Sequence, residues 1–266
     1  MITPDSLFFR FTFYVLPWIT YVVFVLGIVF RVKKWLGGTP REQVKESEGV
    51  PVRKSEGKTM RTIKEFVLNL IVQRSMLRKN PNSIALWVTS WILFHIALFA
   101  ILFGHLRSFH VWYADWFTWA VSREFLVETL PYYVGFVVLA GAVLLLLRRV
   151  FFTAPRSIST TENYAALLLL IMVIAAGVTM RVLPHSAGAF SVTVPPGYTM
   201  YLDDTPSLIW LTVHAFFAQI IVMYLPFSGL IHIIGSIITT IASSLSSARG
   251  EHNAEQKAKG KVEVAQ

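Results

Sequence analysis

Residues 84–105 read IALWVTSWILFHIALFAILFGH, and this stretch decides the fold. It contains no Asp, Glu, Lys or Arg. At about 1.5 Å per residue, a helix of this length crosses the roughly 30 Å hydrocarbon core of a bilayer. Its only ionisable side chains are His95 and His105. The stretch therefore predicts a transmembrane helix carrying two polar groups, which are costly in lipid and need a reason to be there.

Four further stretches have the same character, because each is apolar, free of charged side chains and long enough to span a bilayer. They are Phe11–Phe30, Leu130–Leu147, Tyr164–Met180 and Leu208–Ile238. The last is longer than one span needs, so we expect it to tilt or to project beyond the membrane, with a kink near Pro226. Charged residues make up only 15% of the chain, which is too little for the surface of a soluble domain.

These patterns predict an all-α integral membrane protein, a bundle of five transmembrane helices embedded in the lipid bilayer of the cell (plasma) membrane. Residues 1–241 form the membrane domain, which includes a long basic loop at residues 31–83, and residues 242–266 form a tail. Within the loop, apolar residues recur at near-helical spacing over residues 59–77. This favours an amphipathic helix, lying either in the membrane interface or against the protein's own cytoplasmic end.

The basic residues indicate which side of the membrane each loop occupies. Of the 24 Lys and Arg residues, 20 lie in the segment 31–83, in the loop that begins at Arg148 and in the tail after Ile241. Short loops rich in Lys and Arg remain in the cytoplasm, so we expect the N-terminus outside and the C-terminus in the cytoplasm. This topology accounts for the net charge of +9, so we expect no nucleic-acid partner.

The chain contains no cysteine. This excludes disulfides, iron–sulfur clusters held by thiolates of this chain and covalently attached c-type haem. Any iron–sulfur chemistry must therefore belong to a partner.

Four of the seven histidines lie inside predicted spans. His214 and His232, in the fifth span, are 18 residues apart, which is five turns and about 27 Å of a continuous helix. His95 and His105, in the second, are ten residues or about 15 Å apart. Because the two helices run in opposite directions, His95 and His232 lie near the inner surface, and His105 and His214 near the outer one. Tilt and a kink must absorb the difference of about 12 Å.

Two histidines at each of two levels are what bis-histidine haem requires, so we predict two b-type haems with these four side chains as iron ligands. A zinc site would need ligands gathered at one point, with Cys or carboxylate among them. A proton relay would usually include Asp or Glu. The alternative from another functional class is a transporter or channel with a histidine-lined path. A purely structural anchor would leave the histidines unexplained.

The motif His95-x9-His105 in the second helix, with His214-x17-His232 in the fifth, resembles the gamma subunit of respiratory nitrate reductase. The resemblance covers nearly the whole chain and implies the same five-helix topology and the same two ligand pairs. The long basic loop is more similar to the cytochromes b of sulfite-reduction membrane complexes and of heterodisulfide reductase-like menaquinol-oxidising enzymes. That similarity implies a cytoplasmic iron–sulfur protein as the partner and menaquinone as the quinone.

Two haems stacked across a bilayer connect a quinone near one surface with an electron donor or acceptor near the other. We therefore expect the chain to be a subunit of a quinol-dependent oxidoreductase complex, without catalysis of its own. The partner subunit should dock on residues 31–83 and on the tail.

The residues after His105 suggest where a quinone binds. Hydrogen-bond donors and a proton acceptor follow it closely: Arg107, His110, Tyr113 and Asp115. An interfacial aromatic belt with ordinary polar loop residues is the other interpretation. At the outer end of the fourth span, Arg181 and His185 are candidates to pair with haem propionates, and Arg181 is equally a candidate for an interfacial anchor.

Overall fold

The computed structural model describes residues 4–36, 84–186, 188–195, 197–202 and 205–231. Within these residues, five helical segments are long and apolar enough to cross a membrane, as the sequence predicts. The chain is thus a multi-pass membrane protein. The spans are Leu7–Lys34, Ile84–Ser108, Phe125–Phe151, Thr161–Val182 and Leu208–Phe227.

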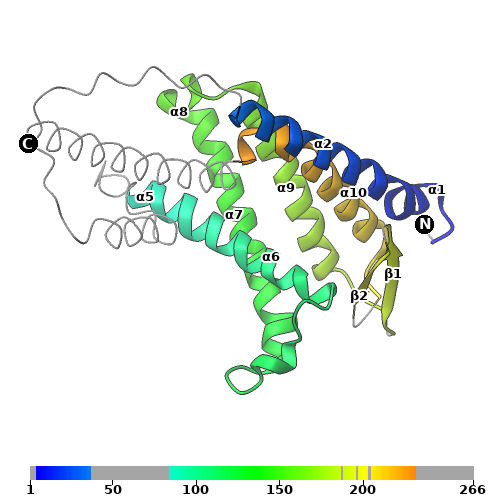
Figure 1. Ribbon diagram of the computed structural model, residues 1–266. Coiled ribbons are helices and arrows are strands. Elements are labelled where there is room, and N and C mark those ends of the chain that lie inside the picture. Colours follow the sequence, from blue (N-terminus) through cyan, green and yellow to red (C-terminus); the bar gives the residue numbers. More distant parts are fainter. Residues whose placement is uncertain (1–3, 37–83, 187, 196, 203–204, 232–266) are drawn as a thin grey trace, which may run out of the picture.

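Each span is built around one main helix, and four of the five also contain a π-helical or 3-10 segment. The main helices are α2 (Leu16–Leu36), α6 (Ala97–Ser108), α7 (Leu130–Phe151), α9 (Thr161–Val182) and α10 (Leu208–Tyr224). Figure 1 shows α2, α10 and α9 side by side, with α7 and α6 beyond α9. The packing order is therefore first, fifth, fourth, third and second span.

The second, third and fourth spans meet in a small-residue core. Val138 and Ala142 of α7 are fully buried there, together with Phe94 and Ile174. A Cβ added at Gly141 would lie 2.9 Å from the backbone carbonyl carbon and oxygen of Leu93, so only glycine permits this approach. Lipid offers no hydrophobic drive between helices, and close packing of small residues takes its place.

The first span is attached to the fifth by polar contacts. It contains the π-helical turn η1 (Phe11–Val15). A turn of this kind changes which backbone carbonyls find a donor within the helix. The Gln219 side-chain nitrogen on α10 donates to the Thr12 carbonyl at 2.9 Å and to the Ala215 carbonyl at 3.2 Å. The Thr20 hydroxyl approaches the Gln219 side-chain oxygen at 3.4 Å. Gln219 therefore ties the two helices together inside the membrane.

The fifth span bends near Pro226, where a kink was expected. The bend is a break in the helix, because α10 ends at Tyr224. A 3-10 turn, η6 (Leu225–Phe227), follows, and Ser228 is extended with φ −107° and ψ 170°. Pro226 has no backbone N–H to continue the helix. Residues 232–238 of the predicted span lie outside the described residues. The predicted axial distance of about 27 Å between His214 and His232 assumed an unbroken helix, and it stays a prediction because His232 lies outside the described residues.

A β-hairpin joins the fourth and fifth spans, and it was not predicted. Strand β1 (Phe190–Val194) pairs antiparallel with β2 (Tyr198–Leu202). Val192 is buried against the first and fifth spans, in a cluster with Phe9, Phe13 and Leu211. We call this end of the bundle the hairpin end. The hairpin covers it beside α10 and the start of the first span (Figure 1).

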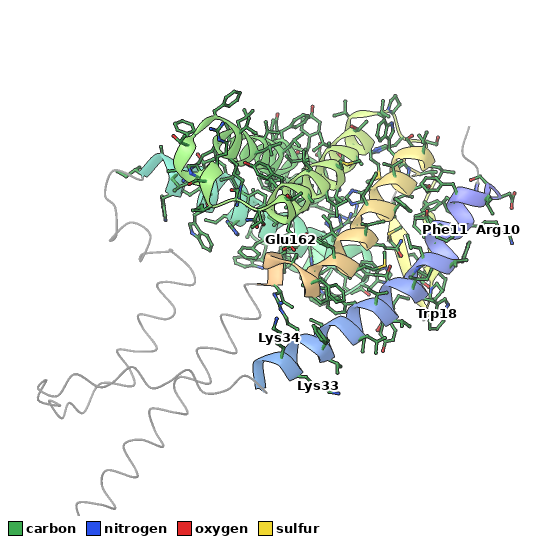
Figure 2. All side chains as sticks on the ribbon, turned by 90° about the horizontal axis from the view of Figure 1, so that it is seen from above. Arg10, Phe11, Trp18, Lys33, Lys34 and Glu162 are labelled. Carbon is green, nitrogen blue, oxygen red and sulfur yellow. The ribbon has the colours of Figure 1, made fainter. Side chains whose placement is uncertain are left out.

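The described basic residues of the predicted cytoplasmic side lie at the opposite end of the bundle. Lys33 and Lys34 occupy the last turn of α2, far from Arg10 of α1 (Leu7–Arg10) at the other end of the first span (Figure 2). Arg148 and Arg149 occupy the last turn of α7. The remainder of the basic loop, its predicted amphipathic helix and the tail at residues 242–266 lie outside the described residues.

Candidate functional site

The rings of His105 and His214 face each other near the hairpin end. Their centroids are 5.8 Å apart and their planes are inclined by 19°. Among the described elements, the helices α6 and α10 do not pack closely against each other. The two side chains, rather than the two backbones, therefore make this approach.

Hydrogen bonds orient both rings in the same way. Nδ1 of His105 lies 2.8 Å from the carbonyl oxygen of Ile101, one turn earlier on α6. Nδ1 of His214 lies 2.8 Å from the carbonyl oxygen of Val173, on α9. A carbonyl oxygen can only accept, so each Nδ1 carries the proton and each Nε2 carries the lone pair. This is the tautomer that metal-binding histidines adopt when they coordinate through Nε2.

Gly177 makes the position of the His214 ring possible. A Cβ added at Gly177 would lie 3.0 Å from Cε1 and 3.1 Å from Nδ1 of His214. The imidazole thus lies directly against the backbone of α9.

The geometry of the pair fits an iron held by two imidazoles. Two imidazoles that share one metal, each with a nitrogen at about 2 Å from it, have ring centres no more than about 6 Å apart. The centroid separation of 5.8 Å lies within this limit. Among the described residues, no three His, Asp or Glu side chains gather closely enough to hold a bare metal ion, as a zinc site would require.

His95 lies in the second span, about 15 Å along the helix from His105 if the rise is α-helical. It belongs to the π-helical segment η3 (Val88–Ile96), and its Nδ1 lies 2.6 Å from the Ser90 carbonyl oxygen. Its ring is half-buried among aromatic side chains, with centroids 5.5 Å from Trp91 and 5.0 Å from Phe94. Because its Nδ1 donates to the Ser90 carbonyl, His95 carries its lone pair on Nε2, as His105 and His214 do. His232, its predicted partner, lies outside the described residues.

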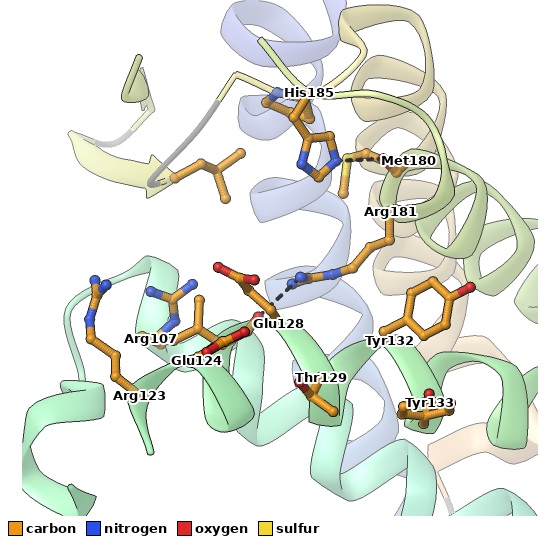
Figure 3. A pocket seen from close by; sticks show the side chains of 13 residues that line it. Arg107, Arg123, Glu124, Glu128, Thr129, Tyr132, Tyr133, Met180, Arg181 and His185 are labelled. Atoms are coloured by element: carbon orange, nitrogen blue, oxygen red, sulfur yellow. Dashed lines mark hydrogen bonds between the residues drawn. The ribbon is translucent and has the colours of Figure 1, made fainter. Parts of the chain in front are cut away.

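A cavity of about 910 Å³ opens at the hairpin end, between the start of the third span, the end of α9 and β2. The turn η5 (Phe125–Thr129) leads into α7 on one side of it. Figure 3 shows side chains of both charge signs around one space. They are Arg107, Arg123, Glu124, Glu128, Tyr132, Tyr133, Arg181 and His185, with Val127, Thr129, Met180, Leu202 and Pro206.

Two hydrogen bonds hold the α9 side of this cavity. Arg181 Nη1 donates to the Val127 carbonyl oxygen at 3.1 Å, across to the third span. His185 Nε2 lies 2.9 Å from the Met180 carbonyl oxygen and donates to it. Arg181 follows Gly177 by one turn, about 6 Å along the helix axis. The cavity therefore begins about one helical turn beyond the His214 ring.

The four residues predicted as a quinone cluster do not form one site. Arg107 lines the cavity. His110, which has a positive φ of 58°, stacks on Tyr201 of β2 with ring centroids 4.4 Å apart, and it contacts Tyr113 at 5.3 Å. Asp115 pairs with Arg123 Nε at 3.7 Å, where both side chains are exposed. Arg107 instead joins the predicted residues Arg181 and His185.

The sequence interpretation missed the acidic wall of the cavity. The third span was predicted from Leu130, whereas helical structure already begins near Phe125. Glu124, Glu128 and Tyr132 recur every four residues and therefore lie close together on one side of this helical segment. Arg181 and His185 have the same spacing at the end of the fourth span. These two sets of i, i+4 spacings were the signal available in the sequence.

Comparison with known proteins agrees with both expected resemblances. The nitrate reductase gamma subunit family model matches residues 82–244, which hold the second to fifth spans. A similar protein is the Hdr-like menaquinol oxidoreductase cytochrome b-like subunit of Archaeoglobus profundus. It is 23% identical over 257 residues, covering 84% of this chain and 75% of the relative.

Proposed function

Because the chain belongs to the nitrate reductase gamma subunit family, we propose that it is the cytochrome b subunit of a membrane-bound menaquinol oxidoreductase. The name of the Archaeoglobus relative supports this choice within the family. In this role the chain carries electrons between the quinone pool and a cytoplasmic iron–sulfur subunit.

The observation that carries the proposal is the pair formed by His105 and His214. Their 5.8 Å separation and their backbone-bonded Nδ1 atoms suit two side chains that would together hold the iron of one haem b. Bound haem supplies one-electron transfer at a potential that its ligands and their hydrogen bonds adjust. The histidines hold the group, and the bundle keeps it out of water. We propose His95 and His232 as the ligands of a second haem b, nearer the opposite end.

We propose the cavity beside the hairpin as the site where menaquinol is oxidised. A quinol is an apolar ring with two hydroxyl groups, so it needs an entrance from the membrane, donors for its oxygens and acceptors for its protons. Arg107 and Arg181 supply charged donors, and Glu124 and Glu128 supply carboxylates. Tyr132 and Met180 supply apolar surface. In this proposal the hairpin end faces outward, so the carboxylates pass the protons to the outside.

The opposite end is proposed to dock the iron–sulfur subunit. Lys33 and Lys34 on α2 and Arg148 and Arg149 on α7 give its described part a positive charge. This charge suits an acidic partner surface, and it supports a cytoplasmic position for this end.

The test is reduction of the purified, full-length protein by a water-soluble menaquinol analogue, followed by the absorbance of reduced haem. We expect reduction of the wild type and much slower reduction of Glu128→Gln, which keeps the shape of the side chain but cannot accept a proton at neutral pH. His110→Gln is the matched control, because His110 lies on Tyr201 outside the cavity wall. Slower reduction in the His110 variant alone would move the site to the loop after α6.

A further inference from the structure

His214 differs from the other described intramembrane histidines in where its hydrogen bond goes. His105 and His95 donate from Nδ1 to carbonyls of their own helical segments, those of Ile101 and Ser90. His214 donates to Val173, which lies on the neighbouring helix α9. The orientation of the His214 ring therefore depends on how closely α9 and α10 approach.

Gly177 is the residue that permits this approach. In an α-helix the N–H of residue 177 points to the carbonyl of residue 173, so Gly177 and Val173 lie one turn apart. The His214 ring contacts both residues and therefore lies against a single turn of α9. A Cβ on Gly177 would meet Cε1 at 3.0 Å and Nδ1 at 3.1 Å. Ordinary contacts between carbon atoms are about 3.5–4.0 Å. A methyl group would therefore displace the ring, or α9 itself, by about half an ångström.

We infer that Gly177 is a positioning residue for His214, which lets its Nδ1 proton stay on the Val173 carbonyl while its ring lies 5.8 Å from that of His105. The inference rests on the proposed function for the identity of the group that Nε2 holds. A hydrogen bond from Nδ1 to a fixed acceptor makes the imidazole a stronger electron donor through Nε2. Stronger donation stabilises the oxidised iron, so Gly177 keeps the haem at the hairpin end harder to reduce.

The experiment is a redox titration of both haems in the purified full-length Gly177→Ala protein, followed by their absorbance. We expect the haem at the hairpin end to become easier to reduce, by about a tenfold change in its equilibrium constant, or about 59 mV for a one-electron couple. The electron paramagnetic resonance signal of the same oxidised haem should also move. The second haem should titrate as in the wild type, because His95 takes its acceptor from its own helix.

Gly135→Ala is the matched control. Its added Cβ would lie 3.2 Å from Cγ2 of Val178, so it presses on the same helix α9 one residue away from Gly177 without meeting a histidine. Both variants replace a helical glycine by alanine. An unchanged titration in Gly177→Ala, or an equal shift in Gly135→Ala, would overturn the positioning role.

A second measurement covers the case in which Gly177→Ala retains no haem. Incorporation of Nδ-methylhistidine at position 214 removes the Nδ1 proton while leaving Gly177 in place. We expect the same haem to become easier to reduce, and an unchanged potential would overturn the inference. The proposed function is judged separately by the haem content of the wild type. Absence of haem there refutes the function, whereas a haem-loaded wild type with unaffected variants refutes only the role of Gly177.

Discussion

Arg181 links the fold to the proposed chemistry, and replacing it by Gln tests both. Its Nη1 donates to the carbonyl oxygen of Val127, a buried residue at the start of the third span. Gln is shorter and uncharged, so the Val127 carbonyl loses this donor and the cavity loses one positive charge. In the wild type the Arg181 side chain also points into the cavity, where it and the Glu128 side chain extend toward each other (Figure 3).

The expected magnitudes follow from the bonds that are lost. A hydrogen bond to a charged group contributes about 1.5–3 kcal/mol, so the free energy of unfolding should fall by about that amount. If the guanidinium also donates to a quinol oxygen, the same range predicts about tenfold to hundredfold weaker quinol binding. Arg181→Lys keeps the charge but not the planar fork of donors, and it should fall between the wild type and Arg181→Gln.

The assay is the initial rate of haem reduction at increasing concentrations of a menaquinol analogue. The account predicts a raised half-saturation concentration in Arg181→Gln, with both haem spectra intact. If Arg181 pairs with a haem propionate instead, loss of its charge should make the nearby haem harder to reduce and leave the half-saturation concentration unchanged. An unchanged concentration together with an unchanged potential would refute both roles for Arg181.

Three further predictions concern other parts of the bundle. His105→Ala and His214→Ala should each remove the same haem and leave the other, whereas His95→Ala should remove the second, as read from the haem content of each variant. Gln219→Leu should lower stability toward thermal unfolding by about 1–2 kcal/mol, because the variant loses the hydrogen bonds between the first and fifth spans. Hydrogen bonds between transmembrane model peptides have about this strength. A crosslinker attached at Lys33 should capture an iron–sulfur protein from the native membrane, and capture of further copies of this chain alone would argue against such a partner.

Much of the fold could be predicted because lipid imposes a simple rule. Residues 84–105 had to be helical throughout, since their backbone polar groups have no other partner in hydrocarbon. The facing of His105 and His214 followed from helix direction and from their positions near one end of their spans. Both features depend only on the sequence and on the thickness of a bilayer.

The break in the fifth span could be predicted only in part. Pro226 indicated a kink, but the apolar run continues past it without a charge, so hydropathy gave no sign that α10 ends at Tyr224. The close approach of the first span was invisible in the sequence. A Cβ at Gly27 would lie 2.8 Å from Pro226 Cβ, so the bend in the fifth span and the glycine in the first fit each other. A contact between residues so far apart in the chain leaves no periodic signal.

The cavity and the hairpin were missed for related reasons. The hairpin segment, VTVPPGYTMY over residues 192–201, has β-branched and aromatic residues around a Pro-Pro-Gly turn, which is a usable strand signal. The signal is short, however, and it stands between two much longer apolar runs. Glu124 and Glu128 carry no functional signal of their own in the sequence. Their importance depends on Arg181 lying opposite, which only the packing of α9 against the third span brings about.

The most direct test of the central claim is the haem content of the purified full-length chain. The account predicts two haems b per chain, released by acid-acetone because the chain has no cysteine to attach them, with the low-spin spectra of bis-histidine iron. A colourless protein without haem would contradict the account and would favour a transporter or channel with a histidine-lined path.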